Sequence, residues 1–148
     1  MKLSNKGRYA IQAVFDLAYH AGERGAQIKE ISERQGIPSR FLEQVFQDLK
    51  KAEMVRSKRG PRGGYHLNVD PGSLRVGDVV RAIEGPVLLA EPASADASTS
   101  EQVLGAALGE LGDQLEACFD ALTFADLCAR ADSLGLSRQP RGRYVYAI

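Results

Sequence analysis

The chain has 148 residues, a formal net charge of zero at pH 7 and two cysteines, Cys118 and Cys128. This length allows one domain with a substantial core, or a small domain with an accessory element, without a disulfide framework. The N-terminus lacks the apolar segment of a signal peptide, and the longest uncharged apolar run, residues 87–90, is too short to span a bilayer. We therefore expect a cytoplasmic protein whose cysteines are reduced thiols.

The charged residues are unevenly distributed along the chain. Residues 1–62 contain thirteen Lys and Arg against seven Asp and Glu, and thirteen minus seven gives a net charge of +6. The neutral total then leaves −6 for residues 63–148. A basic first half favours binding to a polyanion, whereas the acidic remainder does not.

The first predicted helix begins near Ser4, which can cap it, and ends at Gly22. Its buried side consists of apolar residues at helical spacing: Ala10, Val14, Leu17, Ala18 and Ala21. Lys2, Lys6 and Arg8 lie at its start, where cations oppose the helix dipole, and this placement suggests contacts with phosphates. Scattered surface charge is the alternative.

Residues 28–51 have the pattern of two helices joined by a short turn. The first ends at Gly36, Ile37 and Pro38 form the turn, and Ser39 is the predicted N-cap of the second. The second helix has a buried stripe that consists of Leu42, Val45, Phe46 and Leu49. Its opposite face is polar and consists of Ser39, Arg40, Glu43, Gln44 and Gln47. We interpret the first four of these as base contacts in a major groove; solvated residues on an ordinary helical hairpin are the alternative.

A glycine-tipped basic hairpin follows these helices. Residues 55–59 are strand-like and basic, residues 60–64 (GPRGG) form a turn, and residues 65–67 return with alternating apolar side chains. Glycine lets the backbone approach a groove closely, Arg59 and Arg62 suit the negative potential of a narrow minor groove, and Lys58 suits phosphates. The glycines lack the spacing of a nucleotide-binding loop, so we interpret this hairpin as a DNA-binding wing.

Several of these segments resemble those of one family. The sequences MKLSNKGRYA at residues 1–10, ISERQGI at 31–37, LEQ at 42–44, RGPRGGY at 59–65 and VGDVVRAIEG at 76–85 are similar to the winged-helix repressors of the IscR, NsrR and CymR type, the Rrf2 family. The resemblance is continuous over residues 1–85 and weaker beyond. It implies a winged helix-turn-helix fold and sequence-specific binding to double-stranded DNA.

The resemblance also bears on an iron–sulfur cofactor. The iron–sulfur branch of the family holds a [2Fe-2S] cluster with cysteines grouped after the DNA-binding domain, but this chain has no cysteine between residues 87 and 117. Hydroxyl groups do not replace the soft thiolate donors that a cluster needs. We therefore expect no cofactor, and the chain resembles the cluster-free, CymR-type branch more.

The rest of the chain has the pattern of a linker and a long helix. A short helix is predicted to end at Gly85, and residues 91–100, rich in Ala, Ser and Pro, suggest a mobile linker. From residue 101 to 122, apolar residues alternate at spacings of four and three, which is typical of a coiled-coil seam and predicts a homodimer on an inverted-repeat operator. The seam residues are Leu104, Leu108, Leu111, Leu115, Cys118 and Leu122.

Further features of this half are expected to be structural. Three glycines in the long helix indicate that it depends on tertiary contacts. Cys118 is expected to be a small apolar residue of the seam, with a redox switch at the dimer interface as the alternative. A last short helix is predicted to be capped at Thr123, with Leu127 facing inward and Cys128 beside it.

The C-terminal sequence YVYAI ends in an apolar residue and a free carboxylate. It resembles the tails of CymR-type regulators and of serine acetyltransferase, whose terminal isoleucine enters the active site of cysteine synthase (O-acetylserine sulfhydrylase). The resemblance implies that Ile148 anchors this partner and that Tyr146 is a flanking contact. A terminal strand or a packed tail is the alternative.

We accordingly predict a mainly α protein with a small β-hairpin wing. The expected parts are a winged helix-turn-helix domain (1–85), a flexible linker (86–100), a dimerisation helix with a short C-terminal helix (101–131) and a tail (132–148). The functional hypothesis is a homodimeric repressor of cysteine or sulfur metabolism genes, controlled by complex formation with cysteine synthase.

Other functions are alternatives to this hypothesis. A redox- or small-ligand-sensing regulator of other stress or iron–sulfur genes, acting through Cys118, Cys128 or a pocket in the dimer, is the main alternative. An adaptor that binds cysteine synthase but not DNA is disfavoured by the basic wing. No nucleophile, base and orienting group are combined, and His20 and His66 have no second ligand at metal-binding spacing, so neither an enzyme nor a metal site is expected.

Overall fold

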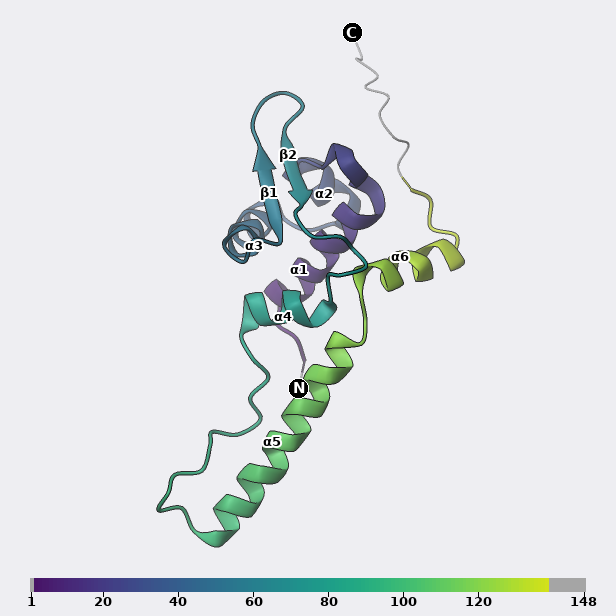
Figure 1. The fold of residues 1–148 in the computed structure, drawn as a ribbon. Helices are drawn as coiled ribbons and strands as arrows, with labels where there is room; N and C mark the ends of the chain where they lie inside the picture. Colours follow the sequence, from purple (N-terminus) through teal and green to yellow (C-terminus); the bar gives the residue numbers. More distant parts are fainter. Residues whose placement is uncertain (1, 139–148) are drawn as a thin grey trace.

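The computed structural model describes residues 2–138, and it is mainly helical with one antiparallel β-hairpin, as the sequence predicts (Figure 1). The elements in chain order are α1 (Asn5–Asp16), a π turn η1 (Leu17–Ala21), a 3-10 turn η2 (Gly22–Arg24), α2 (Ile28–Gln35), α3 (Ser39–Lys51), β1 (Val55–Lys58), β2 (Gly64–Leu67), α4 (Val76–Glu84), α5 (Thr99–Asp120) and α6 (Phe124–Ser133). Among the described residues, no helix is both long and apolar enough to cross a membrane.

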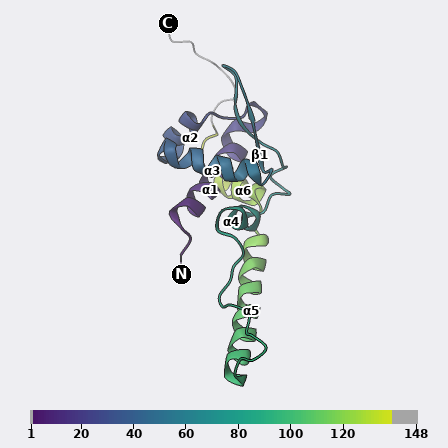
Figure 2. The ribbon, with the colours of Figure 1, turned by 90° about the vertical axis from the view of Figure 1, so that its left-hand side faces the viewer.

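The elements from α1 to α4, together with α6, form one compact body, and α5 projects from it as a rod (Figures 1 and 2). The core of this body includes Val14 and Leu17 from the first helical segment and Phe46 from α3, all at most 2% exposed. Phe124, the first residue of α6, is fully buried in the same core. The chain therefore returns to the body after α5, and burial of apolar surface holds α6 there.

An ion pair fastens α1 to α2. The Asp16 carboxylate, at the end of α1, is fully buried and accepts hydrogen bonds from Nε and Nη2 of Arg34 at 2.9 and 2.6 Å. Nε2 of Gln35 donates a third bond at 3.0 Å. A buried carboxylate is tolerated when its oxygens are paired and hydrogen-bonded in this way.

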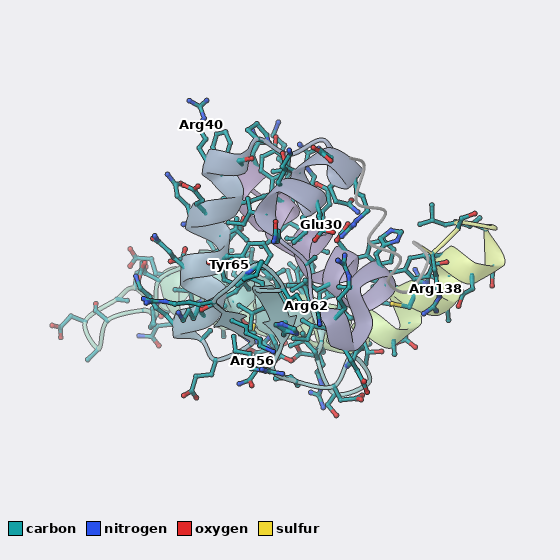
Figure 3. All side chains as sticks on the ribbon, turned by 90° about the horizontal axis from the view of Figure 1, so that it is seen from above. Glu30, Arg40, Arg56, Arg62, Tyr65 and Arg138 are labelled. Carbon is teal, nitrogen blue, oxygen red and sulfur yellow. The ribbon has the colours of Figure 1, made fainter. Side chains whose placement is uncertain are left out.

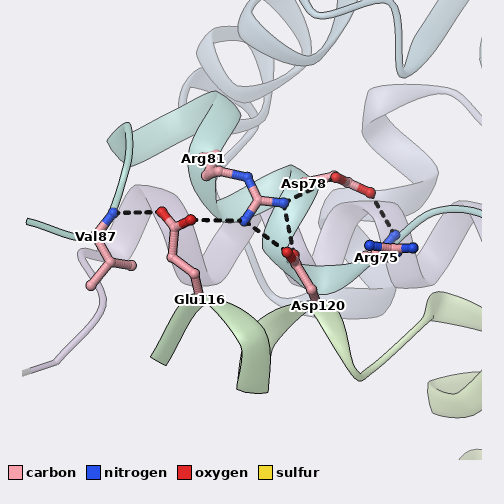
Figure 4. Close-up of polar contacts among 6 residues, drawn as sticks. All are labelled: Arg75, Asp78, Arg81, Val87, Glu116 and Asp120. Carbon is pink, nitrogen blue, oxygen red and sulfur yellow. Dashed lines mark hydrogen bonds and ion pairs between the residues drawn. The ribbon is translucent and has the colours of Figure 1, made fainter. Parts of the chain in front are cut away.

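A second polar group joins α4 to α5 (Figure 4). Nη2 of Arg81, in α4, lies 2.7 Å from Asp120 and 3.2 Å from Asp78, and its Nη1 lies 3.7 Å from Glu116. Glu116 also accepts a hydrogen bond from the Val87 backbone at 2.9 Å. One guanidinium thus links the base of the rod to the body and to the start of the connecting segment.

Residues 85–98 are irregular and run back along α5 (Figure 1). A Cβ on Gly112 would lie 3.1 Å from the Val87 carbonyl oxygen, and one on Gly105 would lie 3.6 Å from Cβ of Ala93. The expected tertiary contact of these two glycines is therefore made by the chain's own connecting segment, whereas a Cβ on Gly109 would have no such neighbour within 4 Å.

The structure corrects the predicted start of the long helix and adds a buried residue in α6. The helix α5 begins at Thr99 rather than at residue 101, because Ser98 accepts from the Glu101 backbone while the Glu101 carboxylate accepts from Ser98. In α6, Leu127 is half-buried and packs against the main core, as expected, and Cys128 beside it is buried as well, at 9% exposure. Cys128 packs beside Tyr19, which a helical pattern of ten residues does not reveal.

Candidate nucleic-acid interface

The helix α3 is strongly two-sided. Its apolar stripe is completely buried and consists of Leu42, Val45, Phe46 and Leu49, as predicted. All five polar residues of the opposite face are exposed: Ser39, Arg40, Glu43, Gln44 and Gln47. Burial of one face fixes the rotation of the helix about its axis, so the polar face is held toward the outside.

The turn between α2 and α3 has the geometry of a tight helix junction. Gly36 adopts a left-handed conformation with φ of 66° and ends α2, and the Ser32 hydroxyl donates to the Ile37 carbonyl at 2.6 Å. The N-cap of α3 is Pro38, so the prediction that Ser39 caps this helix is wrong. Ser39 is instead the first helical residue, because the fixed φ of proline already sets the chain direction there. Its side chain makes no capping bond and is exposed.

The wing is a tight hairpin whose strands pair from Val55 with Leu67 to Lys58 with Gly64. Gly60 has a φ of 108°, and a Cβ on Gly63 would overlap the Lys58 carbonyl oxygen. Glycine is required at these two positions by conformation and by close approach. The cations expected at the tip, Lys58, Arg59 and Arg62, are all exposed.

The wing is rigidly coupled to α3. The ring of Tyr65, in β2, stacks on Phe46 of α3 with centroids 4.3 Å apart and planes 21° apart. Nζ of Lys50 donates to Ser57 Oγ of β1 at 2.9 Å, and Tyr65 and Ala26 exchange backbone hydrogen bonds of 2.7 and 2.9 Å. The wing and the exposed face of α3 therefore form one surface with a fixed geometry. Figure 3 shows Arg40 from α3 and Arg62 from the wing on the same body.

Sequence reasoning missed this coupling. The sequence places Tyr65 in the returning strand and in a family-like segment but does not predict its contact with Phe46, although an aromatic residue directly after a glycine turn is a signal for a hairpin anchor. Lys50 counts only toward the basic charge in the sequence, whereas in the structure it bridges to the wing.

The cations at the N-terminus differ in their surroundings. Lys2 and Arg8 are exposed, and Arg8 lies 3.3 Å from Asn5 Oδ1. Lys6 is half-buried, and its Nζ lies 2.5 Å from Oδ2 of Asp48 in α3. A phosphate contact by Lys6 therefore requires exchange of the Asp48 carboxylate for the phosphate.

The predicted dimerisation seam is only partly covered within one chain. Leu104 and Leu111 are 59% and 49% exposed and Cys118 is exposed, while Leu108 and Leu115 are half-buried. An apolar row on a projecting helix costs solvation free energy unless another surface covers it. The predicted tail contacts Tyr146 and Ile148 lie outside the described residues.

The cysteines do not suit an iron–sulfur cluster. Cys118 lies on the exposed side of α5, and Cys128, in α6, is buried beside Tyr19, where burial raises the pKa of its thiol. Within residues 2–138, no group of three or more His, Cys, Asp or Glu side chains is arranged to hold a metal ion. A cluster is held by several thiolates, so the donor set of this chain does not fit one.

Two helices across a tight turn, with the second exposing a polar face beside a cationic hairpin, define a winged helix-turn-helix protein. Among known families, the Rrf2 model, described as "Iron-dependent Transcriptional regulator", matches residues 3–130. The chain belongs to the Rrf2 family. Because this is a family of transcriptional regulators, the expectation that the chain is not an enzyme is confirmed.

Individual relatives support the family assignment by sequence identity and by structural similarity. The regulator IscR of Aliivibrio salmonicida is 49% identical over 87 residues, which are 59% of this chain and 52% of IscR. The chain thus matches about half the length of such curated relatives. The structure of CymR, described as the global cysteine regulator of B. subtilis, is similar, with a TM-score of 0.73 at 29% identity over 88% of this chain and 98% of CymR. The structure of T. potens IscR is similar with a TM-score of 0.73, at 36% identity over 93% of each chain.

Proposed function

We propose that the chain is a sequence-specific DNA-binding transcription regulator that represses its target genes as a homodimer. The observation that carries the proposal is the single surface formed by the exposed polar face of α3 and the cationic wing, held together by the stacking of Tyr65 on Phe46. In this arrangement Ser39, Arg40, Glu43 and Gln44 contact base edges. Arg59 and Arg62 enter the adjacent minor groove, and the phosphate contacts are Lys2, Lys6, Arg8 and Lys58.

The homodimer follows from the exposed seam of α5. Pairing two seams would cover Leu104 and Leu111 and place two α3 helices on one side of a duplex, about 34 Å apart, which is one helical turn. The operator is then an inverted repeat.

Selection from random duplexes with the full chain tests this proposal. Enriched sites should be inverted repeats, and anisotropy titrations should show that the protein binds them more tightly than random DNA. A matched variant, Arg59→Gln with Arg62→Gln, should bind the selected site at least about tenfold more weakly, because each lost groove contact costs about 1 kcal/mol or more. Enrichment of no motif, or of single half-sites by a monomer, would contradict the proposal.

The regulated genes are a finer part of the same proposal. We infer that they serve cysteine or sulfur metabolism, which is supported by the similarity to CymR over 98% of that chain and by the absence of a thiolate set. Control by cysteine synthase would use Ile148 as the anchor and Tyr146 beside it. Pull-down of purified cysteine synthase with the full chain, and with a chain lacking the last two residues, tests this contact. Equal recovery by both chains would refute the role of Ile148.

The alternative redox-sensing function now depends mainly on Cys118. Burial raises the pKa of Cys128, which lowers its thiolate fraction and its reactivity. Cys118 is exposed on the seam and accessible to oxidants in a single chain. If Cys118→Ala abolishes an oxidant-dependent change in operator affinity, redox sensing gains support; if the wild-type affinity does not respond to oxidant, this alternative is excluded.

A further inference from the structure

A cavity of about 1070 Å³ lies behind the wing. It is lined on one side by η1 and η2, and on the other by Arg56 of β1, His66 and Leu67 of β2, and the loop that follows. Neither the helix α3 nor the expected DNA contacts form part of its wall.

Arg56 and His66 face this cavity from the same side of the hairpin. They are directly paired across the two strands, so their side chains project from one face. The neighbouring pair, Ser57 and Tyr65, projects from the other face, where these residues contact α3. The cavity therefore lies on the side of the wing that is turned away from the reading helix.

The imidazole of His66 is almost fully enclosed in the wall of this cavity, at 7% exposure. Its Nε2 has no hydrogen-bond partner among the described residues, whereas a backbone hydrogen bond with Glu23 engages the ring. An unsatisfied buried polar nitrogen costs about 1–3 kcal/mol, so its persistence calls for a specific reason. Burial lowers the pKa of His66, and the positive charge of Arg56 lowers it further.

Arg56 also lacks a compensating partner, because residues 2–138 contain no ion pair between it and a carboxylate. Of the acidic residues in the wall, Asp70 accepts a hydrogen bond from the Gly72 backbone in its own loop at 2.8 Å. The wall also contains the carboxylate of Glu23, which forms no ion pair with Arg56 among the described residues.

The opposite wall is an irregular piece of helix. The π turn η1 contributes Leu17, Ala18, His20 and Ala21 to the lining. Single π turns inside helices are energetically unfavourable and occur frequently at functional sites. This observation is independent of the charges on the hairpin.

We propose that this cavity binds a small oxyanion, a carboxylate or a phosphate, between Arg56 and His66. The guanidinium donates hydrogen bonds to such a group in a planar fork, and an imidazole N–H supplies a further donor. A bound anion also favours the protonated form of His66, which burial and the charge of Arg56 disfavour. An anion held here connects the back of the wing to η1 and η2. The site goes beyond the proposed function, because its occupancy requires no DNA.

The two histidines of the chain allow a direct test. Both His20 and His66 line the cavity, so every imidazole signal in a proton NMR spectrum reports on it. The full chain without DNA is titrated with sodium phosphate, and separately with sodium succinate, at constant pH and with ionic strength matched by sodium chloride. A His20→Gln variant assigns the signals. Saturable shifts of the His66 signal are expected with at least one of the two anions, and the two titrations distinguish phosphate from carboxylate.

Arg56→Gln and Arg59→Gln provide matched variants, because both remove one exposed wing arginine but only Arg56 lines the cavity. Arg56→Gln should lower the affinity for the anion about fivefold or more, the loss expected for one charge-assisted hydrogen bond. Arg59→Gln should leave this affinity unchanged. Shifts that do not saturate with either anion, or equal weakening in both variants, would overturn the proposal.

Discussion

Asp16 shows how much one buried charge contributes to the arrangement of the DNA-binding helices. It is fully buried and bonds to Arg34, whose side chain is 15% exposed, so the pair is largely removed from water. These hydrogen bonds raise the pKa of Arg34 and keep it charged. The pair fixes α2 against α1, and α2 in turn supports the turn that leads into α3.

The first prediction concerns this pair. Asp16→Ala should lower the free energy of unfolding by about 3–5 kcal/mol, because it leaves a mostly buried guanidinium without its carboxylate. Urea denaturation followed by circular dichroism measures the change. Arg24→Ala, which removes the exposed ion pair with Glu30, is the control and should cost less than about 1 kcal/mol. Equal losses would show that burial of the Asp16 pair carries no special weight.

On the proposed DNA-binding surface, two substitutions should separate contacts with bases from contacts with phosphates. Glu43→Ala should relax base preference at one operator position, whereas Lys58→Ala should weaken binding to specific and random duplexes alike. The lysine variant should also reduce the slope of log affinity against log salt by about 1. Anisotropy titrations at several salt concentrations measure both effects. A Glu43→Ala variant that loses affinity equally for specific and random DNA would contradict its role as a base contact.

Among the elements, α5 has the least typical sequence for a helix. Its glycines occupy different surroundings, since Gly112 lies against the Val87 carbonyl while Gly109 faces open space. The intrinsic helical penalty is the same for both, so their surroundings decide what a methyl group does.

We predict that Gly109→Ala stabilises the chain by about 0.5–1 kcal/mol through helix propensity alone. Gly112→Ala should raise the free energy of unfolding by less than this or lower it, because its Cβ would lie 3.1 Å from a carbonyl oxygen of the connecting segment. Thermal and urea unfolding compare the two variants. A similar gain at both positions would mean that the connecting segment does not pack on α5 in solution.

The starts of α5 and α6 predict a response to acid. The hydrogen bonds from Ser98 hold the pKa of Glu101 below its usual value, and those from Thr123 do the same for Asp126. A lowered folded-state pKa contributes stability that is present above the unfolded pKa, near 4, and that is lost as the pH falls through the folded value. The free energy of unfolding should therefore decline below about pH 4–5, and less so in the double variant Glu101→Gln with Asp126→Asn. An unchanged acid dependence in this variant would contradict the assignment.

For the whole molecule, the exposed seam predicts assembly. Leu111→Asp should convert the dimer to a monomer. Operator binding should then weaken by several orders of magnitude, because each half-site is bound by a separate monomer. Sedimentation velocity and anisotropy measure these two effects. Leu88→Asp is the control, since Leu88 is 65% exposed but lies outside the seam, and it should change neither. A dimeric Leu111→Asp variant would place the interface elsewhere.

The sequence by itself determined most elements of this protein and the face that α3 buries. The stripe of α3, the glycine that ends α2 and the glycines of the wing are local features, since helical periodicity and positive φ are properties of neighbouring residues. The fold class and the family followed from them.

Only the tertiary structure decided which distant residues meet. The contacts of Tyr65 with Phe46, Asp16 with Arg34 and Arg81 with Asp120 join segments from different parts of the chain. The same holds for the cavity between Arg56, His66 and the π turn. Periodicity records only that a residue is buried or exposed, whereas its partner depends on how whole elements pack against one another.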